Sequence, residues 1–347
     1  MSLLQELPAL MRQRSTGSFL AARFLSVLGW QMLAVAMGWH VYALTHDPLA
    51  LGIVGLSEFL PFFLLVLYGG HVADRFSRRR VVMLAYLATM LSLAALLALT
   101  LGGLQRVWPV YACVGVFGAT RAFWAPAMQA TLPLLVSRER LSGAMAVSGL
   151  MFQSAVIAGP SIGGLLYLGG PQLVYAAALL LFGGTVLLVR RIRLPATASM
   201  AGPQEGALHS VVAGLQHVLR TRVLLGALSL DLFAVLFGAC MVAFGLSTSF
   251  TQSFAALLLG GAADMVSVYI RAVLVQLATP EHIRGRVSAV SSMFIGASNE
   301  LGAFESGVTA SWFGTIRSVV GGGLLTLAVA AGWAGLFPPL RRLRHLR

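Results

Sequence analysis

The sequence predicts an all-α integral membrane protein that consists of two helical bundles, with about ten membrane-spanning helices divided six plus four. Hydrophobic residues occupy 58% of the 347 positions and charged residues only 10%, whereas soluble domains carry about 25% charged residues. The hydrophobic residues gather in long stretches, and the charges lie mostly between them. These observations indicate that lipid, not water, is the main solvent of the chain.

Ten stretches are long enough to cross a bilayer, which requires about 20 mainly apolar residues. They cover roughly residues 19–45, 49–69, 81–103, 107–134, 141–168, 171–190, 223–246, 252–276, 285–311 and 317–338. The first stretch follows Arg12 and Arg14 and is too long for a signal peptide, so we expect it to be retained as a helix.

The basic residues alternate with these stretches in a way that predicts the orientation. All 24 basic residues are arginines, against 11 acids, and the formal net charge is +13. With ten spans, nineteen arginines fall on one side, only Arg106 and Arg317 fall on the other, and Arg23, Arg121 and Arg271 lie within spans. The positive-inside rule places both termini in the cytoplasm. Arginines in short inter-helix clusters do not fit a nucleic-acid-binding surface.

One long connection divides the chain. We expect residues 1–190 to form a six-helix bundle, 191–222 a cytoplasmic linker and 223–347 a shortened four-helix bundle. The spacing of apolar residues over 207–222 predicts a short amphipathic helix at the membrane interface.

Two passages suggest that the halves are parallel repeats. Residues 135–143 and 277–285 share Leu, Glu and Gly at an offset of 142. The first half, from Arg14 to Arg190, is 57 residues longer than the second, from Arg222 to Arg341. That difference corresponds to about two helices with their turns.

A short polar segment, Gly70–Arg80, interrupts the apolar sequence between the second and third spans. We expect it to form the turn there, with Asp74 favoured by the dipole of the third helix. The segment is interpreted as a conformational latch, and the alternative is a positive-charge signal for topology alone. The expected latch residues are Gly70, Asp74, Arg75, Arg78 and Arg79.

Several ionisable residues lie inside the predicted spans, where a charge costs about 2.5–3.5 kcal/mol on insertion scales. They are Glu58, Arg121, Asp231, Asp264, Arg271, Glu300 and Glu305. One interpretation is a proton and substrate pathway, in which Glu58 or a carboxylate of the ninth span carries the proton and Arg121 sets its proton affinity. The other is structural pairing, for example of Asp264 and Arg271, which share one face of a helix.

Small residues and aromatic residues mark two further places. Gly159, Pro160, Gly163 and Gly164 allow close helix packing and a kink, with packing alone and an antiport role both open. Phe123, Trp124, Met128 and Gln129 either line a pocket beside Arg121 or are ordinary core and lipid-facing residues.

The segment Gly70-x-x-x-Asp74-Arg75-x-Ser77-Arg78-Arg79 resembles the signature of the major facilitator superfamily between helices two and three. Gly159–Gly164 resembles that superfamily's antiporter signature, and Arg121 lies where many drug/proton antiporters have an arginine. The passages 262–264, 284–287 and 299–302 resemble its siderophore-exporter branch. Ser77 replaces the usual glycine, and a second copy of the latch is not found, as if helix seven were joined to the end of helix nine.

The resemblance implies a secondary transporter of the bacterial inner membrane that exports a small amphipathic molecule, a siderophore or a drug, in exchange for protons. The alternative is a truncated, non-transporting or regulatory relative. The sequence contains no motif of a membrane-embedded enzyme or an ATPase, and we expect no cofactor. Cys113 and Cys240 lack metal-ligand or disulfide spacing. The expected partners are the substrate, protons and the lipid bilayer, without nucleic acid.

Overall fold

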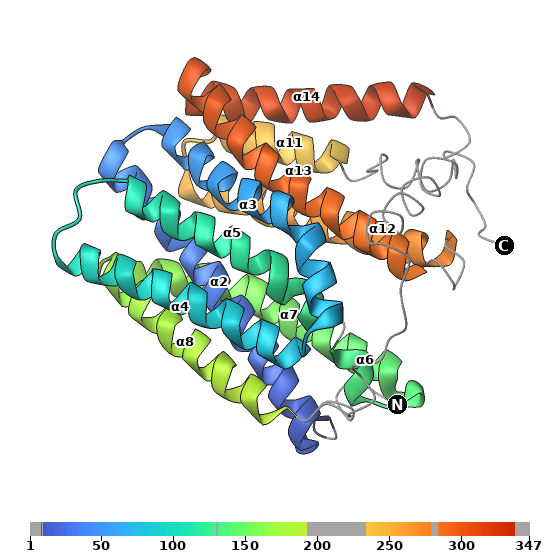
Figure 1. Ribbon diagram of the computed structural model, residues 1–347. Coiled ribbons are helices and arrows are strands. Elements are labelled where there is room, and N and C mark those ends of the chain that lie inside the picture. Colours follow the sequence, from blue (N-terminus) through green and yellow to red (C-terminus); the bar gives the residue numbers. More distant parts are fainter. Residues whose placement is uncertain (1–7, 9, 130, 193–233, 279–283, 337–347) are drawn as a thin grey trace. The chain divides into compact units, whose positions relative to one another are not determined.

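The structure is a computed structural model that describes residues 8, 10–129, 131–192, 234–278 and 284–336 (Figure 1). All regular elements in these ranges are helices. The chain divides into two compact units, Met1–Gln204 and Glu205–Arg347, and each is described by itself.

The described part of the first unit contains six long helices and one short one. They are α2 (Arg14–Thr45), α3 (Pro48–Arg75), α4 (Arg78–Leu101), α5 (Trp108–Gln129), α6 (Leu132–Leu135), α7 (Arg138–Tyr167) and α8 (Pro171–Arg191). Helix α2 packs on α7 and α8, helix α3 packs on α5, and α4 packs between α5 and α8. The unit is therefore a bundle in which α3 and α5 form one closely packed pair.

Local sequence signals set the helix ends. Helix α2 ends at Thr45, and its C-cap His46 has a left-handed φ of 53°. Asp47 then caps α3 by accepting a hydrogen bond from the Leu49 N–H at 2.9 Å, and Pro48 occupies the first helical position, where its missing N–H costs nothing. Helix α8 also has a proline, Pro171, at its first position, and this proline follows Gly170, which has a φ of 95°.

The core of this unit consists of large side chains between the helices. Phe19, Tyr86, Tyr175 and Phe182 are fully or almost fully buried. The ring centroids of Tyr86 and Phe182 lie 5.7 Å apart. Leucines on the outer helix faces, such as Leu180, are largely exposed. Apolar residues both inside and outside the bundle are expected for helices surrounded by lipid.

The second unit contains α11 (Ala234–Leu246), α12 (Phe250–Ala278), α13 (Arg284–Phe313) and α14 (Thr315–Leu336). Helix α11 packs on α12 and α14. Glycines allow the approach of α11 to α14, because a Cβ at Gly323 would lie 2.9 Å from the carbonyl oxygen of Gly238.

The prediction of an all-α membrane protein is confirmed. Seven helices of the described part are long and apolar enough to cross a membrane. They are Arg14–Thr45, Pro48–Val66, Arg78–Leu101, Gly143–Tyr167, Pro171–Arg191, Phe250–Val268 and Thr315–Gly332. Helices α5, α11 and α13 are not among them, so the count of ten spans stays a prediction. The expected amphipathic helix at 207–222 lies outside the described residues.

The turn predicted for the latch segment is shorter than expected. Helix α3 continues through Arg75, and the Phe76 N–H still donates to the Val72 carbonyl at 2.9 Å. Helix α4 begins at Arg78, so only Phe76 and Ser77 connect the two helices. Gly70 and Asp74 therefore lie in the last turns of α3 and not in the connecting turn, and Asp74 precedes the start of α4 by four positions.

Candidate functional site

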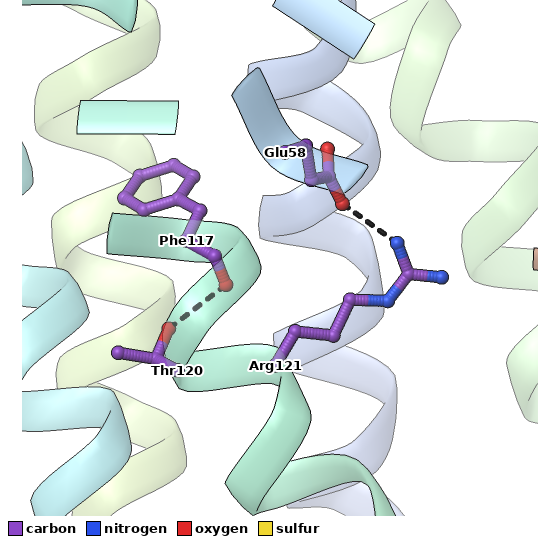
Figure 2. A network of polar contacts seen from close by, with 4 residues as sticks. All are labelled: Glu58, Phe117, Thr120 and Arg121. Atoms are coloured by element: carbon purple, nitrogen blue, oxygen red, sulfur yellow. Dashed lines mark hydrogen bonds and ion pairs between the residues drawn. The ribbon is translucent and has the colours of Figure 1, made fainter. Parts of the chain in front are cut away.

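An ion pair joins two helices inside the first unit. Glu58 lies near the middle of α3 and Arg121 near the middle of α5. Nη1 of Arg121 lies 2.6 Å from Oε1 of Glu58, and the two side chains are 28% and 16% exposed. Figure 2 shows the guanidinium reaching across from α5 to the carboxylate on α3. The structure thus brings together two residues 63 positions apart in the chain.

Small residues allow this approach. A Cβ at Gly118 would clash with the carbonyl oxygen of Glu58, and one at Gly69 would clash with the carbonyl oxygen of Ala122. Pro126 lacks the N–H that would otherwise bond the Ala122 carbonyl within α5. The backbones of α3 and α5 are therefore in direct contact on both sides of the ion pair, and Arg121 is one turn from Gly118.

A second contact fixes the turn of α5 that carries Arg121. The Thr120 hydroxyl donates to the Phe117 carbonyl at 3.0 Å, as Figure 2 shows. The same hydroxyl lies 2.8 Å from Oγ1 of Thr89 on α4. These buried hydroxyls connect α4 to α5 directly beside the arginine.

Two aromatic rings lie close to the guanidinium of Arg121. The Cζ of Arg121 lies 5.1 Å from the ring centroid of Phe62 and 5.8 Å from that of Trp30. Trp30 in turn contacts Phe117 at 5.4 Å and Trp124 at 6.4 Å between ring centroids. Cation–π attraction strengthens when the cation is desolvated. The site therefore holds one charge of each sign among ring faces, which suits an amphipathic ligand.

The indole of Trp124 adds a polar group to this cluster. Its Nε1 is buried and has no hydrogen-bond partner among the described residues. A buried donor without a partner costs about 1–3 kcal/mol. A water molecule or a ligand acceptor next to this atom would remove that cost.

The latch arginines lie at the ends of α3 and α4. Arg75 is in the last turn of α3, and Arg78 and Arg79 open α4. The Arg79 guanidinium donates to the carbonyls of Arg190 and Ile192, both at 3.5 Å. Arg79 thereby connects α4 to the end of α8. The structure describes Gly70 and Asp74 by their backbone only.

The small-residue motif packs α7 against α2. A Cβ at Gly159 would clash with the side chain of Gln31, and one at Gly163 would lie 2.8 Å from Cα of Met32. A Cβ at Gly164 would meet open space. Pro160 lies inside α7 and is partly exposed. Two of the four motif residues therefore set the distance between α2 and α7.

The remaining predicted site residues belong to the second unit. Asp264 and Arg271 lie on α12, and Glu300 and Glu305 lie on α13. The side chains of Asp264 and Glu305 are exposed within that unit. Asp231 and the side chains of Arg271 and Glu300 lie outside the described residues.

Sequence reasoning missed the aromatic partners of Arg121 and a buried polar pair. Nδ1 of His40 on α2 lies 2.8 Å from the hydroxyl oxygen of Tyr175 on α8. A polar residue inside an apolar stretch is the only signal in the sequence for His40, and nothing in it points to Tyr175. Trp30 and Phe62 carry no signal that distinguishes them from other aromatic residues in spans.

Known proteins similar to this chain are exporters and other transporters. The enterobactin exporter EntS of Shigella boydii is 31% identical over 212 residues, which cover 57% of this chain and 47% of that protein. EntS of Escherichia coli O157:H7 is 30% identical over 209 residues, with the same coverage. The chain thus spans about half the length of the curated relatives it matches.

Solved structures with the same fold include a bacterial homologue of the iron transporter ferroportin in an inward-facing state. It has a TM-score of 0.60 and 17% identity over 94% of this chain and 99% of that one. A POT family transporter has a TM-score of 0.70 and 10% identity over 93% and 96%. These similarities show the major-facilitator fold predicted from the sequence.

The family model described as "Transmembrane secretion effector" matches residues 9–229. This range is well over half of the chain and contains Glu58, Arg121, the latch segment and the Gly159–Gly164 motif. The protein therefore belongs to the transmembrane secretion effector family of the major facilitator superfamily.

Proposed function

We propose that this protein takes part in proton-coupled export of a small amphipathic molecule across the bacterial cytoplasmic membrane. Its family and the enterobactin exporters among its relatives support export, and a siderophore or a drug of similar character is the expected substrate class. The observation that carries the proposal is the Glu58–Arg121 ion pair among aromatic rings.

The coupling follows from what the Glu58 carboxylate can bind. When ionised, it pairs with Arg121 and accepts hydrogen bonds from donor groups of a substrate whose rings stack on Trp30 or Phe62. When protonated, it is neutral, weakens its pairing with Arg121 and offers a donor in place of an acceptor. Proton and substrate therefore compete for one carboxylate, and this competition couples their movements in opposite directions.

The low polarity around Glu58 and Arg121 makes the competition between proton and substrate effective. A charge at the centre of a membrane helix is costly unless it is paired, so each state of the carboxylate needs a compensating partner. Arg121 compensates the ionised state, and its contacts with the faces of Phe62 and Trp30 stabilise the cation when Glu58 is protonated.

The test is transport by the full chain reconstituted in liposomes, with a catecholate siderophore and a panel of lipophilic drugs as substrates. An imposed pH gradient should drive substrate movement, and an entrapped pH dye should report a matching proton flux. We expect Glu58→Gln to abolish both the response to the gradient and the proton flux. Asp47→Asn removes a carboxylate at the start of α3 but keeps a good N-cap, so it should transport as the wild type does.

Two outcomes would contradict the proposal. Transport driven by the pH gradient in Glu58→Gln would remove this carboxylate from coupling. If the wild-type chain inserts correctly and moves none of the compounds, the alternative of a non-transporting or regulatory relative is favoured.

A further inference from the structure

Four arginines from three helices of the first unit line one cavity of about 350 Å³. They are Arg14, Arg79, Arg190 and Arg191, and Leu187 completes the lining. Arg14 begins α2, Arg79 lies in the first turn of α4, and Arg190 and Arg191 end α8. None of the lining residues in the described part of the chain is acidic, so the cavity collects positive charge from segments far apart in the sequence.

The helix ends add to this positive charge. Helices α2 and α4 both begin at the cavity, and the N-terminus of a helix carries a partial positive charge from its unpaired N–H groups. The C-terminus of α8 would oppose this effect, but Arg79 donates to the carbonyls of Arg190 and Ile192 there. An anion in the cavity would therefore meet guanidinium groups and helix N-termini together.

The topology signal alone does not account for this arrangement. The positive-inside rule requires arginines in the connecting segments, but it does not require arginines of α2, α4 and α8 to converge on one cavity. Like charges at short distance repel one another. A ligand with negative charge would compensate that repulsion, and a guanidinium matches the two oxygens of a phosphate in shape.

The fifth lining residue indicates where the ligand comes from. Leu187 lies one turn before Arg190 on α8, and its side chain is 61% exposed. Because α8 is apolar enough to cross a membrane, an exposed leucine on it faces lipid chains. The cavity therefore has an arginine-rich part and an apolar border one helical turn deeper, which corresponds to the head group and first methylenes of a lipid.

We propose that this cavity binds the phosphate of an anionic phospholipid in the cytoplasmic leaflet of the membrane. The chemistry recognised is a phosphate group, which a lipid or free phosphate could supply, and Leu187 favours the lipid. Arginines next to the membrane surface are attracted to anionic lipids. A bound lipid would bridge α2, α4 and α8 at the end of the bundle where Arg79 connects α4 to α8.

The test uses the full chain in nanodiscs of phosphatidylcholine with increasing phosphatidylglycerol, with lipid retention read by native mass spectrometry. The wild type should retain phosphatidylglycerol in preference to phosphatidylcholine. Arg14→Gln and the pair Arg190→Gln/Arg191→Gln should weaken this retention by about five-fold for each arginine removed. Arg140→Gln, a cytoplasmic arginine outside the cavity, should retain the lipid as the wild type does.

A charge-keeping variant and a measurement of folding separate loss of lipid binding from loss of structure. Arg190→Lys/Arg191→Lys should restore most of the binding, because it keeps the charge, and size-exclusion profiles identify the folded fraction of each variant. Equal retention by the wild type and the Arg190→Gln/Arg191→Gln variant would overturn the proposal. Inorganic phosphate that raises thermal stability in pure phosphatidylcholine nanodiscs as much as phosphatidylglycerol does would overturn the assignment to a lipid.

Discussion

Gly118 lies directly against the backbone of Glu58, so that α3 and α5 touch at the residue that carries the carboxylate. An added Cβ would lie 2.8 Å from the carbonyl carbon of Glu58 and 3.1 Å from its Cα. One helical turn later, Arg121 reaches the Glu58 side chain. The backbone contact and the ion pair therefore depend on the same distance between α3 and α5.

We expect Gly118→Ala to force α3 and α5 apart, because backbone atoms cannot move aside as a flexible side chain does. Overpacking of this kind costs about 1–3 kcal/mol, so both thermal stability in detergent and transport driven by a pH gradient should fall. The matched control is Gly115→Ala on the same face of α5, where the new Cβ would lie at an ordinary 3.6 Å from the Ser57 carbonyl oxygen. Equal behaviour of the two variants would show that the spacing at Gly118 is not limiting.

The ion pair itself predicts strong coupling between its two members. Glu58→Gln and Arg121→Gln each remove one member of the ion pair and keep the other charge inside a helix of the bundle, where a charge costs about 2.5–3.5 kcal/mol on insertion scales. The double variant leaves no charge, so its loss of unfolding free energy should be smaller than the sum by about 0.5–3 kcal/mol. Denaturation of all four proteins in the same detergent gives this coupling energy.

A second cycle controls for this measurement. Asp47 follows the end of α2. Arg140 lies in the first turn of α7, five positions after Leu135, whose carbonyl accepts from the Thr16 hydroxyl near the start of α2. Asp47→Asn and Arg140→Gln should therefore be additive within about 0.3–0.5 kcal/mol. Additivity at Glu58 and Arg121 as well would mean that the two charges do not stabilise each other.

The helices were largely predictable because their signal is local. Apolar stretches located the six long helices of the first unit, and Pro48 and Pro171 mark the starts of two of them. The latch turn was predicted too long, since Gly70 and the polar residues after it suggested a break. Helix α3 continues because nothing between Gly70 and Arg75 removes a backbone donor, as a proline would.

The site was predictable only residue by residue. Charge inside a span identified Glu58 and Arg121, and the proton-pathway interpretation placed Arg121 beside either Glu58 or a carboxylate of the ninth span. No spacing in the sequence relates residue 58 to residue 121 and so decides between these two partners. Their pairing depends on the rotation of α3 and α5 about their axes. That rotation is set by contacts such as Gly118 on Glu58 and Gly69 on Ala122, which only the three-dimensional packing reveals.

Neighbouring glycines of the antiporter-like motif should differ sharply in their tolerance of a methyl group. Gly163→Ala places a Cβ 2.8 Å from Cα of Met32, whereas Gly164→Ala places one in open space. We expect Gly163→Ala to lose about 1–3 kcal/mol of stability by overpacking. Gly164→Ala should be neutral or slightly stabilising, because alanine has the higher helix propensity. Thermal unfolding of the two variants checks this, and equal losses would contradict a packing role for Gly163.

The latch interpretation leads to a prediction for Asp74. This residue lies in the last turn of α3, four positions before the start of α4 at Arg78. The last turn of a helix disfavours a carboxylate, so the latch interpretation requires that the arginines of this segment and the N-terminal dipole of α4 compensate the charge of Asp74. We therefore expect Asp74→Asn to abolish efflux driven by a pH gradient while membrane insertion remains intact, as measured by transport in liposomes and by reporter fusions.

The control for this prediction lies at the other end of the same helix. Asp47→Asn removes one negative charge from α3 as Asp74→Asn does, but it keeps the side-chain oxygen that accepts from the Leu49 N–H. A loss of efflux in both variants would point to the net charge of α3 and not to the latch. Asp74 is the acid nearest to these arginines in the sequence. If Asp74→Asn kept full efflux, neutralising this acid would have no effect on the transport cycle. The arginines of the segment would then serve as a signal for membrane topology.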